Sequence, residues 1–204
     1  MVAKINLAHM PPDLALYVAV YTDLENASFL KEQLLAGNSD FEYAFIDASM
    51  VVSTKHVLAA AFRAMNDYLN DRLKSRNVHS EAVFSLSPNN NIGEAFRRFG
   101  VSETTKNLLV LKVATSPDIT LESVSRHLSA NIKGRECAFE DATFGTVADV
   151  DRIRKVYKLG AAVSTGRSTT TVNGDSSSNP DKSVDESKAL EVQVLGLMAL
   201  RGAT

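Results

Sequence analysis

The chain has 204 residues, of which 45% are hydrophobic and 23% are charged, and its formal net charge at pH 7 is -2. This composition is typical of one globular domain over residues 1–204, and it excludes an overall basic field, so any nucleic-acid binding must come from a local patch. The single cysteine, Cys137, excludes an internal disulfide and indicates a reducing, intracellular compartment. We find no signal-peptide core near the start and no apolar run near the ~20 residues that span a bilayer.

The first part of the chain predicts a buried strand followed by a helix. Residues 14–21 are rich in strand-forming residues and lie between a Pro-Pro pair and the turn-forming pair Thr-Asp. Thr22 and Glu25 have the spacing of a capping box, which predicts a helix over residues 23–36. Gly37 follows at a position where glycine commonly ends a helix.

A second extended region and a long helix are expected next. Residues 41–52 are predicted to be extended, with a break near Asp47. Ser53 is a good N-cap for a helix over residues 54–70. Apolar residues that recur at helical spacing predict its core-facing side: Leu58, Ala61, Phe62, Met65 and Leu69.

The middle of the chain carries an asparagine-rich turn between two regular elements. Alternating apolar residues over 80–86 predict a third strand, which Pro88 ends because proline donates no backbone hydrogen bond. Asn91 and Glu94 then begin a short helix in a pattern like a capping box. Gly100 is expected to end that helix in a left-handed conformation.

The elements up to residue 160 are completed by a strand and two helices. Residues 107–113 are apolar almost throughout, which favours a central strand. Residues 131–143 give no clear pattern, and Asp149 is the expected N-cap of a short helix that follows. Thr120 caps a helix through residue 127 or 128, whose inward residues are predicted to be Leu121, Val124 and Leu128.

The composition then changes before a final apolar helix. Residues 161–187 are rich in Ser, Thr, Gly, Asn and Asp, which favours a mobile loop over an arm that orders on a partner. Residues 188–201 predict a helix that is apolar on most sides and too short to span a membrane, so it packs into the core, presents a face to another protein, or does both. We expect Leu190, Val194 and Leu197 to face inward. The predicted partner-binding residues are Val192, Leu195, Met198 and Ala199.

A loose cluster of cations between residues 63 and 98 is the best candidate for binding nucleic acid. Acidic residues dilute it, so the alternative is a solvated face with local ion pairs. If the cations share one surface, they contact phosphates while the asparagine amides contact bases or sugars; a single-stranded RNA end suits such a site better than a duplex. Turn and cap roles explain the asparagines equally well. The predicted RNA-binding residues are Arg63, Lys74, Arg76, Asn89, Asn90, Asn91, Arg97 and Arg98.

No pattern in the sequence supports catalysis. The four histidines have no metal-ligand spacing, and no Gly-x-x-x-x-Gly-Lys phosphate loop is present. Cys137 lies beside no obvious base. We therefore predict a non-catalytic protein with no metal and no cofactor.

Several segments resemble a single family. Residues 85–100, Ser-Leu-Ser-Pro-Asn-Asn-Asn-Ile-Gly-Glu-Ala-Phe-Arg-Arg-Phe-Gly, closely resemble the signature of the TPRKB family. Residues 74–81, 132–134 and 150–159 match the same family in order. Its members are small subunits of the EKC/KEOPS complex, and each binds that complex's atypical small kinase. The resemblance covers most of residues 14–160 and the C-terminal helix, and it departs in the longer Ser/Thr-rich segment.

The resemblance implies an α+β fold, with a small mixed, largely antiparallel sheet and helices packed around it. The alternation of strands and helices alone favours a parallel sheet instead. The resemblance also implies that the C-terminal helix docks on the kinase, and that the subunit holds the single-stranded acceptor end of tRNA. The complex's transferase, an indirect partner, then makes threonylcarbamoyladenosine next to the anticodon. The implied location is cytoplasmic and nuclear, with no membrane. The alternative is a regulator of the kinase's ATPase that makes no RNA contact.

Overall fold

The computed structural model describes residues 1–160 and 180–201, and in these parts of the chain the strands form one antiparallel sheet. The strand order is β1-β2-β4-β3, and β5 pairs with the same edge of β2 as β1 does, beyond Ala3 at the start of β1. Every pairing is antiparallel, which confirms the α+β class that the family resemblance implies and makes the parallel sheet favoured by the alternation of elements wrong. The strands are β1 (Ala3–Ile5), β2 (Leu16–Thr22), β3 (Ala44–Asp47), β4 (Leu108–Val113) and β5 (Arg135–Cys137).

Both faces of this sheet are buried. All residues of β2 are buried, and Val18 and Ala19 lie opposite Leu111 and Val110 of β4. Because successive side chains of a strand point to opposite faces, this register supplies apolar residues to a core on each side. The central position of β4, predicted from its apolar run, is confirmed.

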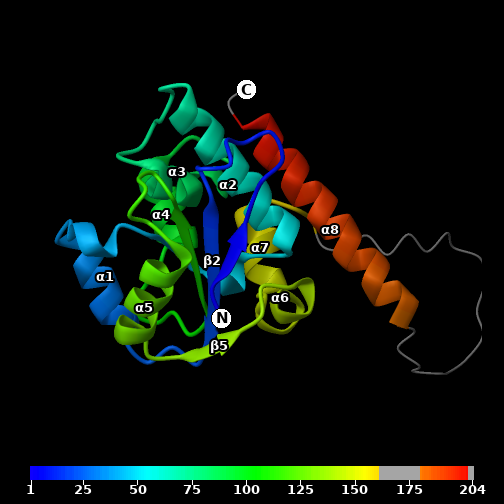
Figure 1. The fold of residues 1–204 in the computed structure, drawn as a ribbon. Coiled ribbons are helices and arrows are strands. Elements are labelled where there is room, and N and C mark those ends of the chain that lie inside the picture. Colours follow the sequence, from blue (N-terminus) through cyan, green and yellow to red (C-terminus); the bar gives the residue numbers. More distant parts are fainter. Residues whose placement is uncertain (161–179, 202–204) are drawn as a thin grey trace, which may run out of the picture.

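Helices form a layer on each face of the sheet, as Figure 1 shows. One layer holds α1 (Ala27–Leu35) and α5 (Leu121–Asn131). The opposite, larger layer holds α2 (Thr54–Leu69), α3 (Val78–Ser85), α6 (Asp141–Val147), α7 (Val150–Val156) and α8 (Pro180–Leu200). Short helical turns, η1 (Ser39–Phe41) and η2 (Ala48–Met50), flank β3, and η2 forms the break predicted near Asp47. Among the described residues, no helix combines the length and apolar content that crossing a membrane requires.

The segment 80–86, predicted as a strand, lies in the helix α3 and the residue after it. The Asn77 side chain caps this helix by accepting a hydrogen bond from the Ser80 N–H at 2.8 Å. Every residue of α3 except Ser80 is buried. A helix buried on nearly all sides has no polar face, so its sequence lacks the period that separates a helix from a strand.

One helix start and two helix faces also differ from the prediction. Thr22 belongs to β2 and α1 begins only at Ala27, so the capping box of Thr22 and Glu25 is wrong. Phe62 and Leu69 of α2, predicted to face inward, are 38% and 45% exposed. The inward positions predicted for Ala61 and Met65 are confirmed, and the small side chains of Ala60, Ala61 and Ala64 let α3 pack closely against α2. On α5, Leu121 is likewise exposed rather than inward.

The caps predicted at Ser53, Asn91, Thr120 and Asp149 are confirmed, because each side chain accepts a hydrogen bond from a backbone N–H in its first turn. Gly37 has the left-handed φ of 67° expected after α1. The last helix starts at Pro180, earlier than the predicted residue 188. Residues 161–179 of the predicted mobile loop lie outside the described residues.

A buried histidine joins three helices of the larger layer. His56 of α2 accepts a hydrogen bond from the Val52 N–H at Nδ1 and donates one from Nε2 to the Tyr157 hydroxyl at 2.9 Å. The Tyr157 hydroxyl in turn donates to the Leu86 carbonyl. Burial lowers the pKa of His56 to about 3, so its ring is neutral and serves the packing of α2, α3 and α7.

Gly100 ends α4 (Ile92–Phe99) for a different reason from the predicted one. Its φ of -72° is not left-handed, but an added Cβ would lie 2.6 Å from the Phe96 carbonyl oxygen. This close approach allows Gly100 to form an isolated antiparallel bridge with Ile46, and the Val101 N–H donates to the Phe45 carbonyl. The glycine therefore fixes α4 at the outer edge of β3.

We predict that Gly100→Ala lowers the free energy of unfolding by about 1–3 kcal/mol, because the methyl group must displace backbone. Gly145→Ala is the matched control, since an added Cβ there meets no atom within 4 Å. Its helical position predicts a change of at most about 1 kcal/mol, in the stabilising direction. Urea denaturation of both variants measures the difference, and equal stabilities would contradict the close approach.

Candidate functional site

The C-terminal helix α8 has one buried stripe and one exposed stripe. Leu190, Val194 and Met198 recur at intervals of four residues and pack into the core of the larger layer. The inward positions predicted for Leu190 and Val194 are confirmed, but Leu197 is only partly buried and Met198 takes the inward place. Met198 is 5% exposed, so its assignment to a partner-binding surface is wrong.

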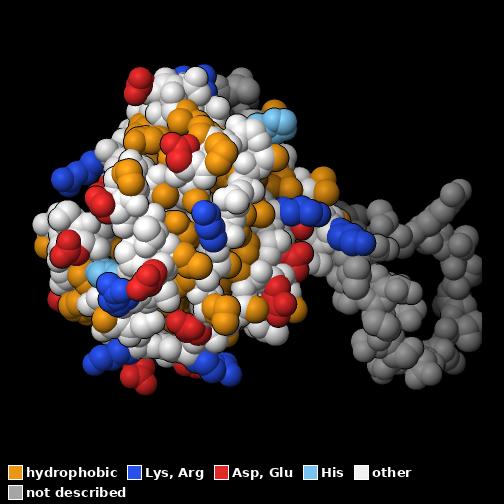
Figure 2. Space-filling view, in the orientation of Figure 1, with side chains coloured by type: hydrophobic (Ala, Val, Ile, Leu, Met, Phe, Trp, Pro, Cys, Tyr) orange, Lys and Arg blue, Asp and Glu red, His pale blue; other side chains and the backbone are white. Residues whose placement is uncertain are grey.

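The opposite stripe of α8 stays on the surface. Val192 is 68% exposed, Ala199 is exposed, and Leu195 is partly buried beside the core. These three residues lie within about 60° of one another on a helix with 3.6 residues per turn, so they form one apolar strip. We call them the α8 strip. Figures 1 and 2 show α8 crossing the outside of the body, with hydrophobic side chains along its upper part.

Arg63, one of the predicted RNA contacts, is engaged inside the protein. Its Nη1 donates to the Met198 carbonyl at 2.8 Å and its Nη2 donates to the Arg201 carbonyl at 3.1 Å. Arg63 thus binds the C-terminal end of α8. No pattern in the sequence indicates this contact, because the bonded residues lie more than 130 positions apart.

Arg97 and Arg98 pair with an acidic residue of their own helix. Both guanidinium groups bond to the Glu94 carboxylate, at spacings of three and four residues along α4. Arg98 also donates to the Val156 carbonyl at 3.5 Å. Local ion pairs, the alternative for these cations, are therefore present.

Lys74 and Arg76 are exposed in the connection before α3. The backbone of this connection is held by the buried carboxylate of Glu81. Its Oε2 accepts from the Lys74 N–H at 3.0 Å, the Ser75 N–H at 2.8 Å and the Ser75 hydroxyl at 2.7 Å. The connection is thus fixed while its two cationic side chains face solvent.

All three asparagines are exposed, but the side chains of two of them also hold the turn and the start of α4. The Asn89 Oδ1 accepts from the Ser87 hydroxyl and the Asn91 N–H, at 3.2 and 3.1 Å. The Asn91 Oδ1 accepts from the Glu94 N–H at 2.9 Å and caps α4. Asn90 is exposed at the tip of the turn.

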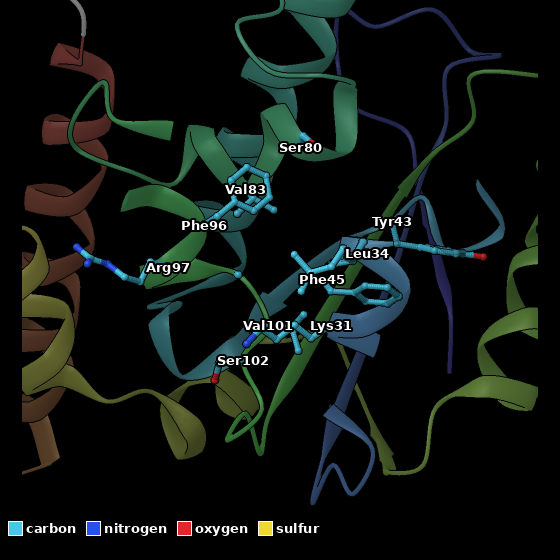
Figure 3. A pocket seen from close by; sticks show the side chains of 12 residues that line it. Lys31, Leu34, Tyr43, Phe45, Ser80, Val83, Phe96, Arg97, Val101 and Ser102 are labelled. Atoms are coloured by element: carbon cyan, nitrogen blue, oxygen red, sulfur yellow. The ribbon is translucent and has the colours of Figure 1, made fainter. Parts of the chain in front are cut away.

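An apolar hollow of about 490 Å³ opens between α1, β3, α3 and α4. Figure 3 shows Val83 and Phe96 on one side and Leu34 and Phe45 on the other, while the Arg97 side chain points away. The hollow is lined by Lys31, Leu34, Leu35, Tyr43, Phe45, Ser80, Val83, Phe96, Arg97, Gly100, Val101 and Ser102. Apart from Arg97, sequence reasoning missed these residues, because they come from four separate segments.

A second, more polar hollow of about 260 Å³ adjoins the first and shares Leu34, Tyr43 and Ser80 with it. Arg76 and Glu42 line this hollow. The nearby His79 ring and the cations Lys112 and Arg76 hold the pKa of Glu42 below its usual value, so its carboxylate is ionised. Two of the predicted RNA contacts thus line these hollows: Arg76 lines the polar one and Arg97 lines the apolar one.

The described residues contain no group of three or more His, Cys, Asp and Glu side chains placed to hold a metal ion. His79 is buried, and its Nε2 accepts from the Val113 N–H at 3.0 Å. Burial lowers the pKa of His79, so the ring is neutral and takes part in packing α3 on β4.

The α8 strip and the two adjoining hollows are accessible surfaces suited to binding other molecules. Residues 21–202 match the family described as kinase binding protein CGI-121, so the chain belongs to this family. This confirms the resemblance that residues 85–100 and the other motifs indicate.

Relatives match the chain over nearly its whole length or over most of it. It is 54% identical to the EKC/KEOPS complex subunit cgi121 of Aspergillus terreus, over 98% of this chain and 96% of that protein. It is 52% identical to the EKC/KEOPS complex subunit CGI121 of Coccidioides immitis, over 98% and 97%. The similarity reaches Schizosaccharomyces pombe, whose EKC/KEOPS complex subunit cgi121 is 32% identical over 72% of this chain and 84% of that protein.

The roles of the asparagines give a testable difference. Asn91→Ala should lower the free energy of unfolding by about 1 kcal/mol, because the Glu94 N–H loses its acceptor. Asn90→Ala, one residue away and exposed, should change it by less than about 0.5 kcal/mol. Thermal and urea denaturation of the pair measures both values, and an unchanged Asn91→Ala would show that the cap does not stabilise α4.

Proposed function

We propose that this protein is a non-catalytic subunit of the KEOPS complex that binds the complex's small atypical kinase and helps to recruit tRNA. The proposal is supported by family membership and by relatives of matching length that carry the name EKC/KEOPS complex subunit. The structural observation that carries it is the α8 strip, an apolar surface on a helix whose other side is fixed in the core.

The α8 strip has the properties of a docking surface for a protein. Its residues are apolar and solvent-accessible, and their burial on association would be favourable by about 25 cal/mol for each Å² of apolar area. The stripe Leu190, Val194 and Met198 holds the helix against the body, so little ordering of the helix opposes binding. We therefore assign Val192, Leu195 and Ala199 to the kinase interface and leave Met198 to the core.

Val192→Asp should raise the dissociation constant for the kinase about tenfold or more, because the interface loses an apolar contact and gains a desolvated charge. Since Val192 is 68% exposed, the melting temperature should not change. Gln193→Asp is the matched control: the next residue is exposed too, takes the same charge, and points about 100° away. Calorimetric titration with purified kinase measures both, and equal affinities of the two variants would contradict this interface.

For tRNA, we propose that the two adjoining hollows and the cations beside them bind the single-stranded acceptor end. Lys74 and Arg76 are exposed on a fixed backbone before α3, where they can contact phosphates, and Asn90 offers an exposed amide at the turn before α4. The apolar hollow next to Arg76 carries Tyr43, Phe45 and Phe96, and its walls suit an unstacked base. This assignment leaves Arg63, Arg98 and the amides of Asn89 and Asn91 with structural roles.

Lys74→Glu combined with Arg76→Glu should abolish most tRNA retention at physiological salt while the fold is kept. Two lost phosphate contacts should also reduce the slope of log affinity against log salt by about 1.4, or about 0.7 for each contact on a single strand. The control is Lys4→Glu with Lys133→Glu, which has the same charge change at exposed positions near the opposite edge of the sheet.

Filter binding with intact tRNA and with tRNA that lacks its terminal CCA measures this assignment. The proposal predicts weak binding of the truncated tRNA by the unaltered protein and no further loss from the charge reversal. Equal binding of both tRNAs would favour the second candidate, a regulator of the kinase's ATPase without RNA contact. That candidate is supported by the engagement of Arg63, Arg97 and Arg98 within the protein.

A further inference from the structure

Two arginines meet at the C-terminal end of α8. Arg63, from α2, donates one hydrogen bond to the Met198 carbonyl and one to the Arg201 carbonyl. The last carbonyls of a helix have no partners within the helix, and positive charge is favourable there. The flat guanidinium group presents two N–H donors in a fixed fork, so a single side chain can hold both carbonyls.

Arg201, the residue after α8, is buried although it is charged. It is 4% exposed, its guanidinium carbon lies 4.0 Å from the centre of the Phe84 ring, and its Nη1 donates to the Phe84 carbonyl. Burial and the nearby positive charge of Arg63 lower the pKa of Arg201 to about 10. The carboxylates of Glu81 and Asp67 oppose this shift, and the group stays charged at neutral pH. Arg201 therefore ties the end of α8 to α3, while Arg63 ties it to α2.

Ahead of Leu190, the described part of α8 lies outside the core. Residues 186–189 are all exposed, and Figure 1 shows the first turns of α8 extending beyond the body. Gly196 lies within the helix with no neighbouring atom near its Cβ position, and a glycine there weakens a helix by up to about 1 kcal/mol relative to alanine. Lys55 and Glu191 form an exposed ion pair at 3.2 Å, which contributes little.

We propose that Arg63 and Arg201 form a clamp that fixes the rotation and position of α8, and so presents the α8 strip to its partner. They are positioning residues: neither needs to contact the kinase. This inference rests on the proposed kinase docking. The clamp gives Arg63 a different role from the one predicted from its charge: Arg63 affects binding of the kinase and not binding of RNA.

The test is Arg63→Met in the full chain, which keeps the length of the side chain and removes its donors. We expect affinity for the purified kinase to fall about tenfold or more, since hydrogen bonds to a charged group are lost at both carbonyls. tRNA binding by the isolated subunit should stay within about twofold. Arg126→Met is the matched control, because Arg126 of α5 is an exposed arginine whose partner is Glu122 at 2.6 Å; it should change neither affinity.

Hydrogen exchange separates positioning from general destabilisation. Under the proposal, Arg63→Met speeds exchange in α8 while the amides of β2 and β4 keep their protection. Arg63→Lys, which can hold one carbonyl but not both, should give an intermediate kinase affinity. It also serves as the readout if Arg63→Met does not fold.

Three results would overturn the clamp. One is normal kinase affinity in Arg63→Met, another is equal loss of protection throughout the sheet, and the third is an Arg63→Lys variant indistinguishable from the unaltered protein. Absence of kinase binding by the unaltered protein is a different outcome, which would refute the proposed function itself.

Discussion

The packing of three α8 residues, Leu190, Val194 and Met198, against the core of the sheet is the interaction on which the functional account depends. It fixes which side of a mostly apolar helix is hidden and which side is available. Without it, every apolar residue of α8 would be equally exposed, and such a surface would bind without selectivity. With it, the exposed apolar residues in the described part of α8 are reduced to Val192 and Ala199 in the strip, with Ala189 and Leu200 outside it.

The distribution of cations follows the same division between structure and surface. The chain has no excess of positive over negative side chains, and the structure places several of its cations at backbone carbonyls or beside carboxylates. Arg63 and Arg201 hold α8, whereas Arg97 and Arg98 balance Glu94. The exposed pair Lys74 and Arg76 stands apart, because its backbone is fixed by Glu81 while its side chains face solvent.

Local features of the fold could be predicted from the sequence, and features set by tertiary packing could not. The caps at Ser53 and Asn91, the strand β4 and the buried residues Leu190 and Val194 each follow from a few neighbouring residues. The helix α3 was mistaken for a strand because burial on nearly all sides removes the polar face that identifies a helix. The antiparallel sheet came from the family resemblance, since the alternation of elements alone favours a parallel one.

The candidate sites likewise combine features that are visible in the sequence with features that arise only from tertiary packing. An apolar helix and a cluster of cations are visible in the sequence, but the choice of Met198 for the surface failed because the buried stripe repeats every fourth residue. The role of Arg63 depends on carbonyls far along the chain, and the hollow is built from four segments that meet only in the fold. Spacing within one segment carries no information about either.

The central claim is that the kinase covers the exposed strip of α8 and leaves its buried stripe undisturbed. Methyl-resolved NMR of the full chain, recorded with and without the purified kinase, tests it most directly. The account predicts large shifts for the methyl groups of Val192 and Leu195, with those of Leu190 and Val194 nearly unchanged. Shifts confined to the α1 and α5 layer, with the α8 methyl groups unaffected, would contradict it.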